Sequence, residues 1–458
     1  MARRSLASLP FPLAALVVFA SLGACTSILG DFTLKPGDGG VPVGEGGPPA
    51  DAPTSTVDAS DAPVTSPFMV DAIQVAAGDR HTCALRKDRN VYCWGDNSKG
   101  QLGTTSSGGD KKPLRVSNLT NVHAIAAGAN HTCALTIPGV FAQGGQVFCW
   151  GDNAFGKLGV ASTTAKSEVP IQVKDGSSQP LSKVGAITAG HEHTCASFDG
   201  GSVLCWGANV SGQLGNAPNN NDNIVARPIN PTSPTQFLAG GAGHTCSIGI
   251  SGGPLPTVVC WGNNDSNQVG RGTGAGQTGY QAPGPVNFPA ASNQEKRLVA
   301  GGFTHSCAID VAQAVYCWGS NYAGEAAQAS PGAGIIVAQP GVVPGLQALA
   351  ISAGEQTTCA VSKGLKVACW GRNDLGQLGI GTAGGGAQSV PQEVQKLTDV
   401  GVIAVGTRHA CAIQKSVPKP GLQDDAAGAV FCWGAGSDNR LGNGSTDFSA
   451  TPVPVVAF

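Results

Sequence analysis

Charged and aromatic residues are scarce in this sequence. Only 12% of its 458 residues are charged and 5% are aromatic, whereas typical soluble domains carry about 25% charged residues. The net charge is −2, so the chain lacks the excess of Lys and Arg that displaces counterions from nucleic acid. No apolar run beyond the first 25 residues is long enough to span a bilayer. We therefore expect no nucleic-acid partner and no permanent transmembrane helix.

Glycine and proline are abundant, with 67 and 30 copies, and favour many tight turns. Residues 1–24 have the order of a lipoprotein signal peptide: Arg3 and Arg4, an uncharged and mostly apolar stretch over 6–22, then small residues before Cys25. The ending Leu-Gly-Ala-Cys resembles a bacterial lipobox. This resemblance predicts an exported chain, anchored to the membrane through a lipid on Cys25, and Thr26 favours the outer membrane by the enteric sorting rule. The alternative is an ordinary cleaved signal peptide.

Residues 25–67 are rich in Gly, Pro, Asp, Ala and Thr, with almost no large apolar residue after Leu34. Such a segment cannot bury enough surface to offset its ordering entropy. We expect a disordered tether that spans roughly 35 Å as a flexible coil.

One pattern recurs seven times in the rest of the chain. It reads Gly-x-x-His-Thr-Cys, followed by Cys-Trp-Gly-x-Asn-x-x-Gly-Gln-Leu-Gly, and the first copy begins at Gly78. The first cysteines of successive copies lie 50 to 62 residues apart, and each second cysteine directly precedes one of the seven Trp. A repeat of this length is typical of arrays in which each copy forms one structural unit.

The 15 cysteines equal Cys25 plus seven pairs. Alternating apolar residues around each pair favour strands, and a hairpin would place the two cysteines opposite each other, with Cα atoms about 4.5 Å apart. That separation permits a disulfide, and export supplies an oxidising compartment. Zinc binding is the alternative, although paired zinc ligands are two to four residues apart. We expect one disulfide per copy: Cys83 with Cys93, Cys133 with Cys149, Cys195 with Cys205, Cys246 with Cys260, Cys307 with Cys317, Cys359 with Cys369 and Cys411 with Cys432.

The copies resemble the repeat of the regulator of chromosome condensation family, through Gly-x-x-His-Thr, Trp-Gly-x-Asn and Gly-Gln-Leu-Gly. The resemblance covers about residues 72–458 and implies an all-β fold, a seven-bladed β-propeller with four-stranded antiparallel blades over residues 68–458. The paired cysteines replace positions that are usually apolar or small in that family. The chain begins without a Pro-x-x-Val strand and ends with one near Pro452. We expect this C-terminal strand to complete the first blade and close the ring.

Two positions after each Trp predict left-handed backbone. The third residue after Trp is Asn in six copies and Gly436 in the last, and the sixth is Gly in five copies but Asn267 and Asn439 in two. Gly and Asn tolerate positive φ best, so we expect it at most of one or both sets.

Six of the eight histidines occupy the Gly-x-x-His position: His81, His131, His193, His244, His305 and His409. A residue present once per blade is architectural in this interpretation, because neighbours in a ring lie too far apart for zinc ligation at about 2.0–2.1 Å. We expect no metal or cofactor site and no catalytic residue. An enzyme that acts on envelope polysaccharide is an alternative, although no constellation of residues points to it.

The two residues before each of these positions vary between copies and should form a ring of loop tips on one propeller face. A fixed frame with variable tips suits recognition, although solvated turns would look the same. The candidate binding residues are Asp79, Arg80, His191, Glu192, Phe303, Glu355 and Arg408. Longer hairpins over 136–147, 249–259 and 414–430, and an apolar loop over 329–346, are alternative surfaces.

We therefore expect an envelope-anchored binding scaffold with a protein or polysaccharide partner and no enzymatic activity. The family resemblance also implies guanine nucleotide exchange on a small nuclear GTPase, with chromatin contact, which export and the acidic net charge oppose. Plant ultraviolet-B photoreceptors of similar repeat carry Trp in a Gly-Trp-Arg-His-Thr turn, where this chain has Asp79. A surface spacer without a specific ligand is the plainest alternative.

Overall fold

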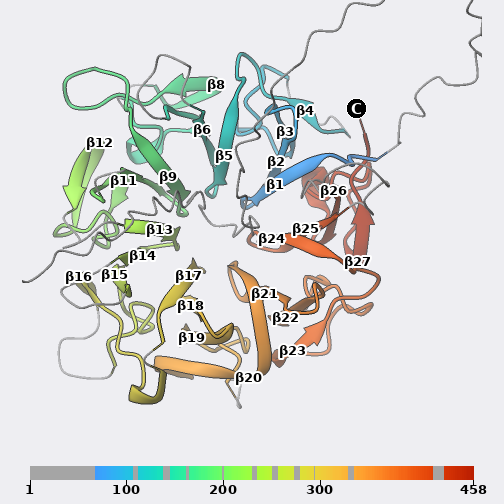
Figure 1. Cartoon of the computed structure of the whole chain (residues 1–458). Coiled ribbons are helices and arrows are strands. Elements are labelled where there is room, and N and C mark those ends of the chain that lie inside the picture. The colour runs from blue at the N-terminus through green and yellow to red at the C-terminus, as the bar shows by residue number, and fades with distance from the viewer. Residues whose placement is uncertain are drawn as a thin grey trace, which may run out of the picture.

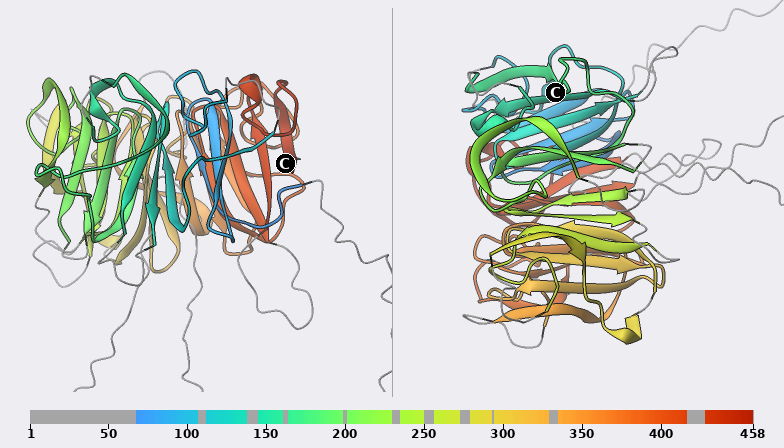
Figure 2. Two further views of the ribbon diagram at one scale, coloured as in Figure 1. Left: turned by 90° about the horizontal axis from the view of Figure 1, so that it is seen from above. Right: turned by 90° about the vertical axis from the view of Figure 1, so that its left-hand side faces the viewer.

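The computed structural model describes residues 68–106, 112–137, 145–160, 164–198, 201–229, 235–249, 256–272, 279–292, 294–328, 335–415 and 428–457. These residues form the expected ring of seven antiparallel blades around a central axis (Figure 1). Viewed edge-on, the ring is a disc whose strands run from one face to the other (Figure 2). No helix in the described ranges is both long and apolar enough to cross a membrane.

Each blade consists of consecutive strands, and the first strand of each lies nearest the axis (Figure 1). Blade one contains β1 (Ala72–Ala77), β2 (His81–Arg86), β3 (Val91–Gly95) and β4 (Leu114–Arg115); blade two contains β5 (Val122–Ala127), β6 (His131–Thr136), β7 (Val147–Asp152) and β8 (Lys166–Gln172). Blade three contains β9 (Val184–Ala189), β10 (His193–Phe198), β11 (Val203–Asn209) and β12 (Asn219–Ile229); blade four contains β13 (Thr235–Gly240), β14 (His244–Gly249), β15 (Thr257–Asn263) and β16 (Tyr280–Pro285).

Blades five and six share one long strand. Blade five contains β17 (Lys296–Gly301), β18 (His305–Asp310), β19 (Ala314–Ser320) and the first part of β20 (Ile336–Ala353). Blade six contains the second part of β20, followed by β21 (Thr357–Ser362), β22 (Val367–Gly371) and β23 (Gln388–Glu393). Blade seven contains β24 (Val400–Val405), β25 (His409–Lys415), β26 (Gly428–Gly434) and β27 (Ser449–Pro454). Short 3-10 turns are η1 (Ala154–Gly156), η2 (Ala290–Ser292) and η3 (Ser437–Asn439).

The C-terminal strand lies at the closure of the ring, but it completes the seventh blade rather than the first. β27 pairs with β26, and β4 supplies the fourth strand of blade one. The Pro-x-x-Val segment thus follows its own Cys-Trp-Gly strand, so a blade ends with this strand instead of beginning with it. The N-terminal segment joins the closure through the bridge between Phe68 and Val456 and the bond from Met69 N to Val455 O.

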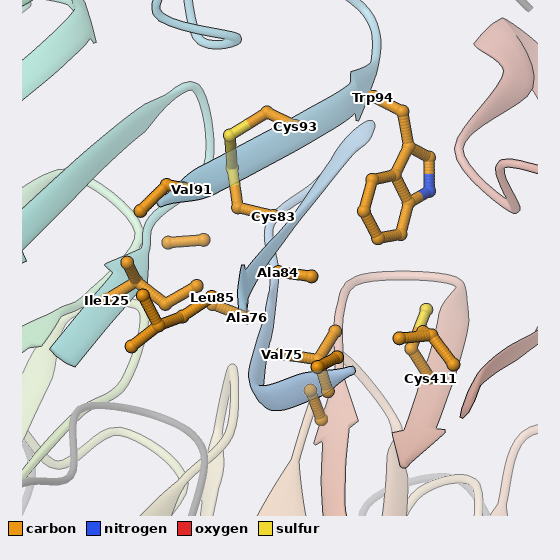
Figure 3. Close-up of a cluster of buried hydrophobic side chains, with 14 of the residues drawn as sticks. Val75, Ala76, Cys83, Ala84, Leu85, Val91, Cys93, Trp94, Ile125 and Cys411 are labelled. Atoms are coloured by element: carbon orange, nitrogen blue, oxygen red, sulfur yellow. A yellow bond between two sulfur atoms is a disulfide. The ribbon is translucent and has the colours of Figure 1, made fainter. Parts of the chain in front are cut away.

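All seven predicted disulfides are formed. In each blade the two cysteines are directly opposed on the second and third strands, with Cα atoms 4.0 to 4.1 Å apart, and all of them are fully buried. Figure 3 shows the pair of blade one among Val75, Leu85 and Val91. The disulfides therefore take the place of apolar contacts inside each blade. The bonded pairs are Cys83 with Cys93, Cys133 with Cys149, Cys195 with Cys205, Cys246 with Cys260, Cys307 with Cys317, Cys359 with Cys369 and Cys411 with Cys432.

The positive φ angles fall on one of the two predicted sets. The sixth residue after each Trp has φ between 58° and 82°, including Asn267 and Asn439. The third residue does not, with φ of −116° at Asn153 and −105° at Gly436. Its Asn side chain instead fastens the loop: Asn97 Oδ1 accepts from Leu102 N at 3.0 Å while its Nδ2 donates to Ser106 O at 2.6 Å.

Candidate functional site

A repeated hydrogen-bond network joins neighbouring blades at each interface, which we call a seam. Between blades one and two, His81 Nε2 lies 2.9 Å from Thr132 Oγ1, and Thr132 Oγ1 donates to Gln101 O at 3.1 Å. Trp150 Nε1 donates to the same carbonyl at 2.9 Å. The equivalent His pairs are His131–Thr194, His193–Thr245, His244–Ser306, His305–Thr358 and His409–Thr82.

This geometry and burial together set the protonation state of the seam histidines. The hydroxyl hydrogen is committed to the carbonyl, so Nε2 must donate to the hydroxyl. Nδ1 then carries a lone pair and has no hydrogen-bond partner within the described residues. Burial lowers the pKa of His81 to about 4 and that of His244 to about 3. These histidines are neutral, and the structure gives them the architectural role that their repetition predicted.

One seam differs from the other six. Blade six carries Thr357 in place of His, and blade seven carries Ala410 in place of Thr, so this bond cannot form. Val405 fills the space that the imidazole occupies in the other seams. Its Cγ1 lies 2.7 Å from the point where a Cβ added to Gly354 would lie. In the six turns that keep the histidine, the Cε1 atom of its ring lies within 2.7 Å of the same point on the first glycine of the turn. Three substitutions therefore replace one polar contact with an apolar one.

The candidate binding residues gather at one end of the central channel, where the Gly-x-x-His turns lie; we call this end the mouth. Asp79, His191, Phe303 and Glu355 line the channel there, together with glycines and alanines of the inner strands. The space between them is small, about 70 Å³. Side chains from blades one, three and five thus converge across the mouth, which the order of the repeats along the chain did not indicate.

His191 is the centre of a charged cluster at the mouth. Its Nε2 lies 3.3 Å from Asp79 Oδ2 and its Nδ1 lies 3.3 Å from Glu192 Oε1. Burial opposes its charged form, but the hydrogen bonds to Asp79 and Glu192 outweigh it and raise the pKa of His191 to about 9. The ring packs edge-on against Phe303, with centroids 5.4 Å apart. His191 is therefore an imidazolium that links blades one, three and five.

Two buried cations at the mouth were not among the predicted site residues. Lys157, whose side chain is fully buried, pairs with Glu192 and with Asp152, the latter at 2.7 Å. Arg440 donates to Asp79 O at 2.9 Å and to Asp438 at 3.0 Å. Both occupy the position that is Gln in four blades, and this departure from the repeat was the signal that could have identified them.

The same two substitutions change the backbone of the turn. Where the repeat has Gln, its side-chain oxygen accepts from the backbone N–H two residues earlier, as Gln101 does from Lys99 N at 2.8 Å. Lys157 and Arg440 have no acceptor in their side chains. The residue two positions before each, Phe155 and Asp438, has φ of 61° and 62°. The backbone two residues before this position is therefore left-handed in the two blades that carry a cation instead of Gln.

Exposed apolar side chains surround the mouth unevenly. Phe155, Tyr322 and Phe303 are 39%, 56% and 39% exposed, and all lie on turns that open on the mouth face. Blades seven, one, two and three contribute the paired charges described above, whereas blade five contributes Phe303 and Tyr322. The mouth face thus has a charged sector and a largely apolar sector.

A groove of about 420 Å³ lies beside the mouth, over blade seven. Its lining includes three arginines, Arg80, Arg408 and Arg440, and the apolar side chains of Leu375 and Ala435. The structure therefore places all seven predicted binding residues at or next to the mouth, either in the channel, in this groove or, for Glu192, in the pair with Lys157.

Some of the predicted features lie outside the described residues. These are the signal peptide, Cys25 and the tether up to residue 67, and the tips 138–144, 250–255, 329–334 and 416–427 of the alternative surfaces. In the described part of the chain, no group of three or more His, Cys, Asp or Glu side chains could hold a metal ion.

Comparison with known proteins identifies both the repeat and the fold. The family model of the RCC1-like domain matches residues 43–331, and that of the regulator of chromosome condensation (RCC1) repeat matches residues 366–413. The chain is 27% identical to the Arabidopsis thaliana ultraviolet-B receptor UVR8, over 81% of this chain and 79% of the receptor. It is 28% identical to the Mus musculus regulator of chromosome condensation, over 85% of this chain and 78% of the relative.

Solved structures show the same architecture. Prp20p of Saccharomyces cerevisiae, described with its binding to Gsp1p and histones, superimposes with a TM-score of 0.66 at 20% identity, covering 85% of this chain and 88% of Prp20p. Human WBSCR16 superimposes with a TM-score of 0.63 at 22% identity, covering 75% of this chain and 87% of that protein. At such identities the likeness concerns the fold.

Proposed function

The chain belongs to the family of RCC1-like propellers, and from this premise we propose that it is a non-enzymatic binding scaffold that recognises a protein through its mouth face. In this proposal Cys25 carries a lipid that anchors the chain in the cell envelope, at the outer membrane, and residues 25–67 tether the propeller to it. The propeller is a rigid frame, because each blade contains a disulfide and each seam a buried Trp. Such a frame pre-organises the loop tips that it carries, which lowers the entropic cost of binding.

The observation that carries the proposal is the composition of the mouth face. Aromatic and arginine side chains dominate the binding energy of protein interfaces, and this face exposes Phe155, Phe303, Tyr322, Arg80 and Arg408. In contrast, only 5% of the whole chain is aromatic. Exposed anchors are therefore concentrated where the turns vary between blades.

The central channel is too small to enclose a small ligand. Pockets for small molecules occupy about 300–1,000 Å³ and bury most of the ligand, whereas the space at the mouth is about 70 Å³. The carboxylates of Asp79 and Glu192 are both held by His191, which leaves neither of them positioned as a free acid or base for polysaccharide cleavage. These features support binding rather than catalysis.

The activities of the relatives receive less support from the residues. Prp20p binds Gsp1p and histones, but the net charge of −2 in this chain offers no basic surface excess for chromatin. All seven Trp are fully buried, and each indole N–H is bonded to a carbonyl of the preceding blade. They serve as seam residues, which disfavours a role in light detection.

A crosslinking pull-down from intact envelopes of the source organism tests the proposal. The test variant is Phe303→Ala with Tyr322→Ala, which removes two exposed rings from the apolar sector. The matched control is Val311→Ala with Val390→Ala, which truncates side chains that are 48% and 62% exposed away from the mouth. We expect a protein that is captured by the wild type and the control but reduced about tenfold or more by the test variant.

Two outcomes would overturn the proposal. Absence of any protein above background would refute protein binding, and loss of the prey only in the control would move the binding surface away from the mouth. The anchor has its own readout, because Cys25→Ser should release the propeller from the membrane fraction. If this variant stayed in the membrane fraction, the proposed lipid anchor would be wrong.

A further inference from the structure

The groove over blade seven contains three guanidinium groups in different states. Arg440 is nearly buried and fully engaged: its three nitrogens donate to Ser437, Asp438 and Asp79 O. Arg80, whose side chain is 51% exposed, donates from Nε and Nη2 to the two carboxylate oxygens of Asp438, at 2.8 and 2.7 Å. Asp438 thus holds two arginines in place.

Arg408 is the least engaged of the three. Its side chain is 44% exposed, and its one ion pair in the described part of the chain is with Glu355, at 3.6 Å from Nε. That separation exceeds ordinary hydrogen-bond distance. The Nη atoms of Arg408 therefore offer a planar pair of donors, and a bidentate carboxylate is the geometry that such a pair binds best.

Most acids near the groove are already paired; the exception is Glu355 beside Arg408, whose buried Oε2 has no hydrogen-bond partner within the described residues and lies 3.6 Å from Arg408 Nε. Asp79 is the one acid in the lining, and its carboxylate is held by His191 and by a threonine hydroxyl. Asp438, next to the groove, is shared between two of the arginines. Asp374, close enough for its charge to interact with that of Arg408, is itself paired with Arg372 at 2.7 Å. An incoming anion would meet donors and no free carboxylate in the lining, whereas an incoming cation would have to displace one of these pairs.

The remaining floor is apolar and suits an alkyl stem. Leu375 and Ala435 lie in the lining with the arginines, and a volume of about 420 Å³ exceeds that of a single side chain. We propose that this groove binds an acidic segment of the protein partner, with a Glu or Asp carboxylate on Arg408, a second acidic group near Arg80, and intervening methylene or apolar groups on Leu375 and Ala435. This inference rests on the proposed function, since it assigns a partner chemistry to one part of the mouth face.

Short peptides test the groove without knowledge of the partner. The probe is a rhodamine-labelled peptide of alternating Glu and Leu, with the matching Gln/Leu peptide as its uncharged counterpart, and fluorescence anisotropy gives the affinity. We expect the wild type to bind the Glu peptide about tenfold or more tightly than the Gln peptide at low salt, with weaker binding in about 0.5 M NaCl because exposed ion pairs are screened.

Variants distinguish binding in the groove from nonspecific attraction between the peptide and exposed arginines. Arg408→Ala should weaken binding of the Glu peptide about tenfold, and Arg408→Lys should restore only part of it because Lys cannot form the bidentate pair. Arg115→Ala is the matched control, since Arg115 is an exposed arginine on β4 that is bonded to Asn90, and it should bind as the wild type does. Circular dichroism confirms that each variant is folded.

Three results would refute this groove. They are equal affinity for the Glu and Gln peptides, an unchanged affinity in Arg408→Ala, and no rise in the anisotropy of the labelled peptide up to about 1 mM protein, a concentration at which even a millimolar interaction is visible. Competition by inorganic phosphate as strong as that by the peptide would show a simple anion site and would also overturn a peptide groove. Failure of the groove can be distinguished from failure of the proposed function. Capture of a prey that needs Phe303 and Tyr322 but not Arg408 would keep the scaffold and refute the groove, whereas absence of any prey would refute the scaffold.

Discussion

The Gly-x-x-His turn builds two layers of the propeller that differ in almost every property. Its histidine lies inward, in the seam, whereas the two residues before it lie at the mouth. Histidine itself occurs in both layers: burial lowers the pKa of His193 and His305 to about 3, while at the mouth the pKa of His191 is raised to about 9 against the burial penalty by Asp79 and Glu192. The same side chain is neutral in one layer and charged in the other.

Under the proposed function, this difference separates stability from recognition within one repeat. The seam layer repeats because each hydrogen bond must fit the next blade, so a change in one residue needs a change in its neighbour. The mouth layer varies because its side chains pair with residues that differ from blade to blade, as Glu192 does with Lys157 and Arg80 with Asp438. Residues that break the repeat are therefore the better guide to function, and residues that keep it are the better guide to stability.

The largest expected effect is the loss of stability in acid that the seam histidines cause. The folded pKa of each seam histidine lies below its ordinary value of 6.5, so the unfolded chain binds protons that the folded chain cannot. Stability is present above pH 6.5 and is lost as pH falls toward about 4 and then 3. Each of the four histidines with a pKa of about 3 or 4 costs about 2 kcal/mol at about pH 5. We expect these four to lower the free energy of unfolding by about 8 kcal/mol between about pH 7 and pH 5, measured by urea denaturation with disulfides intact. His131 and His409, whose pKa values burial also lowers, add to this loss.

His191 provides the contrast within the same experiment. Its folded pKa is raised, so its contribution is present below pH 6.5 and is lost as pH rises through about 9. His244→Gln should reduce the proton uptake on acid unfolding by one, whereas His191→Gln should leave the acid limb unchanged. A free energy of unfolding that stays flat from about pH 7 to pH 5 would contradict the neutral seam.

Removal of one seam hydroxyl should destabilise the protein less than acid does, but more than the same change at an exposed residue. Thr245→Val keeps the shape of the side chain but leaves His193 Nε2 without an acceptor and removes one donor from Gln213 O. A buried unsatisfied polar group costs about 1–3 kcal/mol, so we expect about 2 kcal/mol of destabilisation by urea denaturation. Thr398→Val, the same change at an exposed position, should stay within about 0.5 kcal/mol. Equal effects at both sites would show that the seam bond carries no net stability.

Much of the seam layer could be predicted from sequence because it repeats. The blades, the seven disulfides and the structural role of the histidines all follow from residues that recur at fixed spacing. The assignment of the C-terminal strand to the first blade was wrong, because a repeat fixes the order of strands but not where one blade ends and the next begins. The prediction of positive φ at one or both sets of residues after Trp was confirmed for the sixth residue, but the sequence did not show which set it would be, because Asn97 at the third position acts through its side chain rather than through its backbone.

For the mouth layer, the sequence predicted which residues share a face but not which of them are in contact. Their shared position in the turn placed them on one face, but the contact of Asp79 with His191 joins blades one and three across the channel. No local pattern encodes such a contact, because it depends on the width of the ring. Lys157 could have been found in the sequence, since a cation replaces Gln where the turn needs an acceptor.

The smallest effect should come from restoring the one seam that lacks the His–Thr bond. Thr357→His, Val405→Ala and Ala410→Thr together recreate the residues of the other six seams, with Gln377 O able to accept a second donor beside Trp433. A net hydrogen bond contributes about 0.5–1.5 kcal/mol, so we expect the triple variant to gain about 1 kcal/mol in the free energy of unfolding, measured by urea denaturation.

Each of the three changes made singly should destabilise the protein or do nothing. Thr357→His alone would place an imidazole against Val405 and leave its Nε2 without a hydroxyl to accept its proton. Val405→Ala alone opens the space that the valine fills beside Gly354. The gain must therefore appear as a coupling between the three sites. If the three effects simply add, the introduced His and Thr do not form the hydrogen bond of the other six seams, and the predicted gain is wrong.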